Sequence, residues 1–377
     1  MNAMRPYQLS LLFLMLTTGE LFATDRVVSV TGTYNTISSA VAASADGDRI
    51  LIAAGTYNEF VHLSRSISLL PLVEGERFQL TQTLTVVQAN GSTILISGMK
   101  GTYLQLVGTY TSPTTLRIVD SYFQGCQLSA PNFRVELLRD TIQQSIQISS
   151  GLVVGCSITG GVGGTYHLSV IGNNQSPDDL LIIGNTFGSV SGDGDLFLST
   201  NDRIRMENNF IRSQRSPIVD VIRTGPVLGG ASVFLNNTVH TTIIDGGGSF
   251  ICGFMGAYPQ NIIVKNNAIM NYNGGFLGPL PFNAAVVQSH NMIAPPSSID
   301  IGTGEPVIGS AFIDAGDPDP RYLDLDLTRN DVGCYGGSNS RANFTTPMGS
   351  AVVGFMYAPR VVAQGEPVNI TATGFDR

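Results

Sequence analysis

The chain has 377 residues, of which 43% are hydrophobic and 13% are charged, and its formal net charge is −8. A chain this apolar can bury a substantial core, which excludes an intrinsically disordered protein. An acidic chain with two lysines and no basic stripe argues against nucleic acid as a partner. The 43 glycines and the absence of Trp favour closely stacked strands joined by many turns.

Residues 1–23 have the pattern of a signal peptide. Arg5 supplies the positive end, residues 11–16 form a short apolar run, and small residues follow as far as Ala23. The run is too short to cross a bilayer, and no later segment is apolar enough to do so. We therefore expect a secreted or cell-surface protein without a membrane span. A buried core strand is the alternative interpretation of this run.

The next segments predict a strand, a short helix and a second strand, at residues 24–35, 36–45 and 49–53. Ile37, Ala40 and Val41 lie on one face of the expected helix. A stack of strands leaves an apolar end exposed, and a helix laid across that end removes it from water.

A repeated pattern then runs through the middle of the chain. Apolar residues at alternate positions mark a strand with one buried face, and a small polar residue follows where the chain turns a corner. Units of one form at spacings of about 20–30 residues are typical of a solenoid. The corners are Ser121, Asp140, Cys156, Asn185, Asn209, Asn237, Asn267 and Asn291. We expect the corner asparagines to hydrogen-bond from coil to coil, as a structural ladder rather than a binding site.

Two end segments resemble a known group. TYNTISSAVAASADGDRILIAAGTYNE (33–59) is similar to the opening of exported bacterial right-handed parallel β-helix proteins of the pectin-lyase-like superfamily. IDAGDPDPRYLDLDLTRNDVGCYGG (313–337) resembles their closing segment. The resemblance implies an all-β fold, a right-handed parallel β-helix over residues 24–337 with a short N-terminal capping helix.

The repeats stop after Gly337. Residues 338–346 have the composition of a linker, and residues 347–377 contain short strand-like pieces. They resemble the start of a β-sandwich-like module, which about thirty residues are too few to complete.

Charged residues gather between residues 193 and 223, and this stretch supplies most candidate site residues. The arginines suit an acidic ligand, and the acidic residues of a Gly-rich loop suit Ca²⁺. The candidates are Arg203, Arg205, Arg212 and Arg215 for ligand binding, Asp193 and Asp195 for Ca²⁺, and Arg205, Asp220 and the more distant Lys265 for catalysis. The alternative is a solvated patch in which these charges pair with one another.

A second acidic cluster lies within residues 313–337. Its candidates for Ca²⁺ are Asp314, Asp317 and Asp319, with three further aspartates among residues 324–331. Calcium takes six to eight oxygen ligands, which such a cluster can supply. Asp also bonds to its own backbone in turns, so turn formation is the alternative.

The four cysteines, Cys126, Cys156, Cys252 and Cys334, show neither a CxxC motif nor the close spacing of a metal site. We expect thiols buried within the stack, while disulfides are the alternative in an exported protein.

Two functions remain open. The superfamily resemblance brings in enzymes that cleave acidic polysaccharides, but the polygalacturonase pattern is incomplete. Asp178-Asp179 and Arg203–Arg205 are similar to two of its elements, and a GHG element is missing. The first hypothesis is an exported β-helix protein that binds a polysaccharide or serves as a cell-surface scaffold, with no reaction assigned. The alternative is a polysaccharide lyase or glycoside hydrolase acting on uronate-containing glycans.

Overall fold

The computed structural model describes most of residues 23–376. Outside the described part lie residues 1–22, 88–90, 160–165, 173–178, 189–194, 214–218, 224–226, 228–229, 242–248, 256–259, 271–274, 278–283, 345–350, 358–361, 363 and 377. The expected signal peptide, Asp193 and Arg215 therefore fall outside it. Within the described ranges, no helix is long and apolar enough to cross a membrane.

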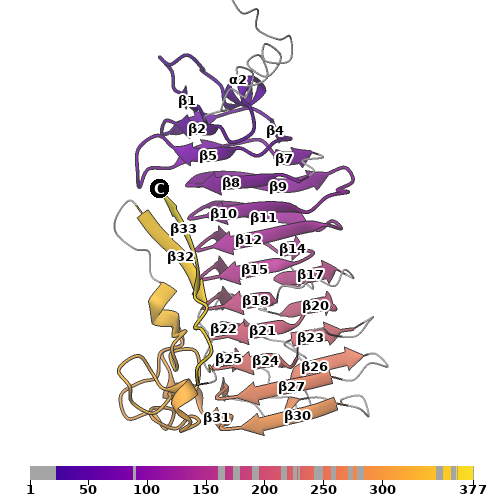
Figure 1. Cartoon of the computed structure of the whole chain (residues 1–377). Coiled ribbons are helices and arrows are strands. Elements are labelled where there is room, and N and C mark those ends of the chain that lie inside the picture. Colours follow the sequence, from indigo (N-terminus) through magenta and orange to yellow (C-terminus); the bar gives the residue numbers. More distant parts are fainter. Residues whose placement is uncertain are drawn as a thin grey trace, which may run out of the picture.

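Parallel strands stacked coil upon coil form the molecule (Figure 1). One long sheet takes one strand from each coil. Its twelve described strands are β1 (Asp25–Val28), β2 (Arg49–Ile52), β5 (Ser68–Pro71), β8 (Thr93–Ser97), β10 (Thr114–Val119), β12 (Phe133–Leu138), β15 (Gly151–Val154), β18 (Leu180–Ile183), β21 (Ile204–Glu207), β24 (Ser232–Leu235), β27 (Gln260–Lys265) and β30 (Ala284–Ser289).

The remaining solenoid strands form the other faces, and they too pair in parallel. The early coils contain β3 (Gly55–Tyr57), β4 (Val61–Leu63), β6 (Phe78–Leu80), β7 (Leu84–Val87), β9 (Met99–Val107) and β11 (Tyr122–Leu128). From β11 onward two separate stacks run side by side. The first is β13 (Thr141–Ile142), β16 (Ser157–Ile158), β19 (Thr186–Phe187), β22 (Phe210–Ser213), β25 (Thr238–Thr241), β28 (Ala268–Met270) and β31 (Met292–Ala294). The second is β14 (Ile146–Ile148), β17 (Leu168–Gly172), β20 (Leu196–Thr200), β23 (Val219–Ile222), β26 (Ser249–Met255) and β29 (Gly275–Leu277).

The expected right-handed parallel β-helix is thus confirmed, and its core is the column of inward side chains. In β18, Leu180 and Ile182 are buried, and they lie in register with Ile204 and Met206 of β21. Each coil adds such residues to one continuous apolar cluster, and burying a side chain of this size contributes about 1.5–3 kcal/mol.

A short helix covers the N-terminal end of the stack, as expected (Figure 1). Helix α2 (Ile37–Ala43) begins at Thr36, whose hydroxyl accepts a hydrogen bond from the Ser39 N–H, and Ile37 and Ala40 are buried beneath it. The Glu59 carboxylate accepts bonds from the N–H groups of Ile37 and Ser38, at 2.7 and 2.8 Å. A carboxylate is favourable there because the free N–H groups of a helix start carry positive partial charge.

From β8 onward, each corner after the long sheet in the described chain is made by a residue with left-handed backbone. Gly98 precedes Met99, and the others directly precede the polar corner positions. These others are Asp120, Arg139, Gly155, Gly184, Asn208, Asn236, Asn266 and His290, and φ lies between 49° and 68° throughout. Gly and Asn adopt this conformation at low cost. The corner is therefore a two-residue unit, of which the repeat pattern revealed only the second residue.

The corner asparagines bond to one another through the stack. Asn209 Oδ1 accepts from the backbone N–H of Asn185 at 3.0 Å and from Asn185 Nδ2 at 2.9 Å. Asn209 Nδ2 donates to the Ile182 carbonyl at 2.8 Å. The same arrangement links Asn209 to Asn237, Asn237 to Asn267 and Asn267 to Asn291. These side chains are largely buried, so they satisfy backbone groups that water does not reach.

Asp140 occupies the same corner position as a fully buried carboxyl group. It accepts from the N–H groups of Ser121 and Leu138, at 2.8 and 3.1 Å. Desolvation raises the pKa of Asp140 well above its usual range, despite those two bonds. The folded state therefore binds this proton more tightly than the unfolded chain does, which lowers stability as the pH rises above about 4.

The chain after β31 folds back over the corners. It contains three short 3₁₀ helices, η1 (Pro296–Ser298), η2 (Pro320–Tyr322) and η3 (Arg341–Phe344). We call residues 295–344 the closing segment. A second core lies between it and the outer side of the coils, formed by Phe210, Ala268, Met270, Ile299, Phe312, Val332 and Cys334. Of the residues expected as a linker, η3 packs on the solenoid, with Phe344 against Gly155 and Gly184. In the expected module start, β32 (Ala351–Tyr357) and β33 (Thr371–Asp376) pair antiparallel.

Replacing Asn209 with Ala tests the corner stack. The change leaves two buried donors of Asn185 without their acceptor, and each such loss costs about 1–3 kcal/mol. We expect the free energy of unfolding, measured by urea denaturation, to fall by roughly 2–6 kcal/mol. The control is Asn261→Ala, at an exposed position of β27. Equal losses for both variants would contradict this role.

Replacing Asp140 with Asn tests the buried carboxyl group. The amide keeps an oxygen for the Ser121 N–H, loses the acceptor of the Leu138 N–H, and removes the charge that burial penalises. We expect a higher melting temperature than wild type at pH 7.5, and a smaller difference at pH 4.5, by differential scanning calorimetry. Glu74→Gln, at an exposed position, controls for the change in net charge. A variant less stable than wild type at pH 7.5 would refute the prediction.

Candidate functional site

Arg203 and Arg205 are both engaged by carboxylates. Arg203 forms a bidentate pair with Asp179 of the preceding coil, at 2.7 and 2.6 Å. Arg205 alternates with the buried Ile204 and Met206 on β21, and it lies 2.7 Å from Glu207 on the same strand. Glu207 in turn accepts from Asn339 Nδ2 of the closing segment at 2.8 Å. Both arginines therefore hold the structure together at the face formed by the long sheet.

Arg212 lies on another face and contacts the closing segment. From β22 it donates to the carbonyl groups of Ile301 and Gly302, and its guanidinium lies 4.7 Å from the centroid of the Phe210 ring. Asp195 is buried and accepts a hydrogen bond from the Ser213 hydroxyl.

The candidate catalytic residues do not come together. Asp220 lies on β23, in the second stack, and burial raises its pKa. Lys265 Nζ lies 2.7 Å from Asp317 Oδ2 and 5.1 Å from the centroid of the Tyr322 ring. Arg205, Asp220 and Lys265 thus sit on different strands, Arg205 and Lys265 each pair with a different carboxylate, and Lys265 fixes the closing segment to the last coils.

The aspartates of the closing segment bond mainly within it. Asp319 pairs with Arg321, whose side-chain and backbone hydrogen bonds lower the pKa of Asp319 to about 2. Asp314 donates its backbone N–H to Asp331 Oδ1, and Asp317 donates its own to Asn266 Oδ1. In the described part of the chain, no three His, Cys, Asp or Glu side chains are placed to hold a metal ion.

Cys126, Cys156 and Cys334 are buried free thiols. The structure does not describe the side chain of Cys252.

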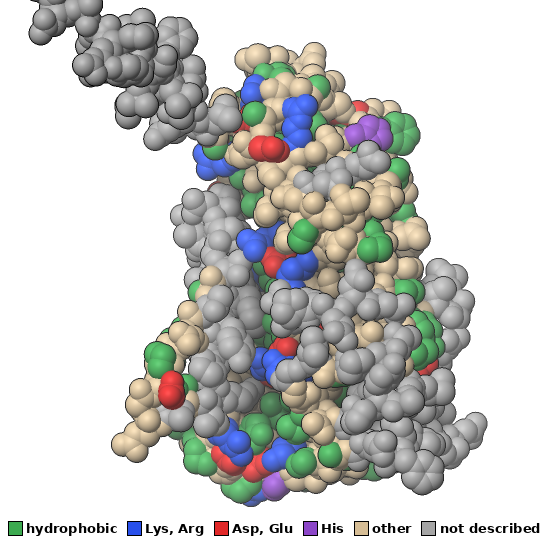
Figure 2. All heavy atoms as spheres, turned by 45° about the vertical axis from the view of Figure 1, so that its right-hand side comes forward, with side chains coloured by type: hydrophobic (Ala, Val, Ile, Leu, Met, Phe, Trp, Pro, Cys, Tyr) green, Lys and Arg blue, Asp and Glu red, His purple; other side chains and the backbone are tan. Residues whose placement is uncertain are grey.

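Charged side chains gather in opposite pairs on the face that Figure 2 presents, where blue atoms lie beside red ones. Between these pairs the described surface is largely uncharged. Arg117 and Glu136 form an opposite pair between neighbouring coils, at 2.6 Å. Pairing of this kind leaves few charges free to bind an acidic ligand.

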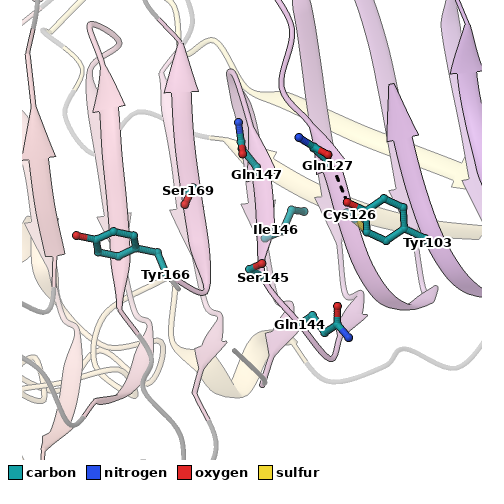
Figure 3. A pocket seen from close by; sticks show the side chains of 9 residues that line it. All are labelled: Tyr103, Cys126, Gln127, Gln144, Ser145, Ile146, Gln147, Tyr166 and Ser169. Carbon is teal, nitrogen blue, oxygen red and sulfur yellow. Dashed lines mark hydrogen bonds between the residues drawn. The ribbon is translucent and has the colours of Figure 1, made fainter. Parts of the chain in front are cut away.

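A groove of about 380 Å³ lies outside the second stack, where β11, β14 and β17 run side by side (Figure 3). Every side chain that lines it is uncharged. The lining residues are Tyr103, Cys126, Gln127, Gln144, Ser145, Ile146, Gln147, Tyr166 and Ser169. The Tyr103 hydroxyl lies 3.4 Å from Gln127 Oε1, and the Tyr166 ring packs at 5.1 Å against Phe197. Amide groups and aromatic rings therefore meet in one hollow.

The groove is part of a longer outward column. Strand register aligns one outward position from each coil, in the order Gln105, Gln127, Gln147, Ser169, Phe197 and Asp220. The charge patterns of the sequence did not reveal this column. In the sequence, the only sign of this column is a Gln that recurs at an outward strand position in three consecutive coils. Such a Gln is equally typical of an ordinary solvated surface.

No protein-family model matches the chain, and no curated protein matches it in sequence. Among solved structures, the chain is similar to the crystal structure of pectate lyase Pel9A. The TM-score is 0.40 and the sequence identity is 14%, over 84% of this chain and 97% of that chain. This likeness concerns the fold and carries nothing about the groove.

Proposed function

We propose that the chain is an exported β-helix protein that binds uncharged carbohydrate in the groove of Figure 3. The observation that carries this proposal is the lining of tyrosine, amide and hydroxyl side chains without any charge. A Gln side chain both donates and accepts hydrogen bonds, as sugar hydroxyl groups do. Aromatic rings pack against the apolar faces of sugar rings while their polar ends stay wet.

The repeat of the solenoid suits a polymer rather than a single sugar. Neighbouring strands lie about 4.8 Å apart, so Gln105, Gln127 and Gln147 offer one amide at each step along the axis. A glycan chain lying along this column would meet the same chemistry coil after coil. Many weak contacts of this kind add up through effective concentration.

Export and the partner belong to the same proposal. The apolar run of residues 11–16, behind Arg5 and before Ala23, supports a cleaved signal peptide and a secreted or cell-surface location. The polysaccharide would then be a component of a cell surface or its surroundings, with the solenoid serving as a scaffold there.

A lyase or hydrolase acting on uronate-containing glycans is the alternative. A lyase needs a base and a cation such as Ca²⁺ near one another, whereas a hydrolase needs two carboxyl groups across the glycosidic bond. Asp220 lies in the outward column, while Arg205 and Lys265 are engaged by Glu207 and Asp317. The alternative therefore requires one of these pairs to open on binding.

Replacing Gln127 with Ala tests the groove. We expect affinity electrophoresis in gels containing neutral polysaccharides to show about tenfold weaker binding, since one or two hydrogen bonds are removed. Gln79→Ala, at an outward position of β6 away from the groove, is the matched control. Equal weakening by both variants would contradict the groove.

A parallel assay separates the alternative. Purified wild type is incubated with pectate and alginate, with and without Ca²⁺, and absorbance of unsaturated uronate is followed in the ultraviolet. Product formation that is lost in Lys265→Gln would establish the enzyme and overturn the proposal of a binding protein for uncharged glycans. Binding to neutral glycans without any product supports the proposal.

A further inference from the structure

We propose that a second hollow, between the closing segment and the corners of the solenoid, binds a small oxyanion, either a carboxylate or a sulfate group. The hollow measures about 200 Å³ and lies apart from the groove of Figure 3. Its walls include the backbone at Gly155 and Gly184, and Arg341 of η3. This site is independent of the proposed carbohydrate groove, with which it shares no lining residue.

Arg341 brings an uncompensated positive charge to this hollow. Its guanidinium donates to the Thr303 carbonyl at 2.9 Å, to the Tyr335 hydroxyl at 3.3 Å and to Thr186 Oγ1. All three acceptors are neutral, and in the described structure no carboxylate forms a salt bridge with Arg341. Its Nε is buried without a hydrogen-bond partner. A guanidinium withdrawn from water gains from an oxyanion, which it binds through parallel N–H groups.

A second arginine strengthens the positive charge at this place. Arg212 and Arg341 both lie over the Phe210 ring, at 4.7 and 6.0 Å from its centroid. Arg212 donates to carbonyl groups, among them those of Ile301 and Gly188. Burial lowers the pKa of Arg212 and the neighbouring charge of Arg341 lowers it further, while the Asp300 carboxylate raises it. Two cations held this close in an acidic protein form a local site for an anion.

Three hydroxyl groups complete the donor set. Ser157 and Thr186 are paired in register on β16 and β19, so their side chains lie one above the other at the wall of the hollow. The Thr186 and Tyr335 hydroxyls accept bonds from Arg341, which leaves their own protons available to donate. An arginine with three hydroxyl donors, and no acidic side chain in the lining, selects an anion over a neutral ligand.

The proposal is tested by titrating the full-length protein with sodium sulfate and sodium acetate at constant ionic strength set by sodium chloride. Isothermal titration calorimetry is expected to show saturable binding of at least one of these ions to the wild type. Arg341→Gln should weaken it at least tenfold. The matched control is Arg321→Gln, which removes the same charge at an exposed position beside Asp319. Absence of saturable binding, or equal binding by Arg341→Gln, would overturn the proposal.

A second variant keeps the test decisive if Arg341→Gln does not fold. Ser157→Ala removes one hydroxyl donor and leaves Arg341 in place, so we expect a several-fold loss of affinity at an unchanged melting temperature. Unchanged affinity would count against the hollow as the site.

Titration with glucuronate and glucose identifies the source of the anion. Binding of glucuronate but not glucose points to an acidic sugar, and binding of sulfate alone points to the inorganic ion; either result supports the site.

Discussion

At the corners that follow β8, β10, β15, β18, β21, β24 and β27, a backbone N–H finds its acceptor on a side chain of the next coil. The side-chain oxygen at the next corner meets this need at Ser121, Asp140 and the asparagines from Asn185 onward. Without that oxygen, the buried donor would cost more than a typical hydrogen bond contributes. The register of all three strand stacks depends on this bond, since each corner fixes where the next strand begins.

The corner also explains which parts of the fold could be predicted from sequence. Alternation such as that of Ile204 and Met206 reports directly on burial, and the corner asparagines repeat in fixed relation to it. The preceding left-handed residue was not visible, because Gly, Asn, Asp, Arg and His all occupy it. A backbone conformation shared by such different side chains leaves no compositional pattern.

The candidate sites were harder to predict for a related reason. A search for charge found Arg205 and Lys265, but their partners depend on the fold. Lys265 meets Asp317 across 52 residues of sequence, which no local spacing reveals. The uncharged groove was missed because a Gln on an outward strand position looks like solvated surface until register aligns it with its neighbours. Several charges of the described chain pair with one another and secure the coils and the closing segment.

The closing segment also sets a length for the solenoid. Repeat proteins often gain or lose units, because each unit contacts only its neighbours. Here one continuous segment is attached at Gly184 through Phe344 and at Asn266 through Asp317, several coils apart. A coil inserted between those two points would increase the distance between them by about 4.8 Å. The segment could then keep only one of its two attachments. The two attachments therefore fix the number of coils between them. This part of the protein can vary in its loops more readily than in its number of repeats.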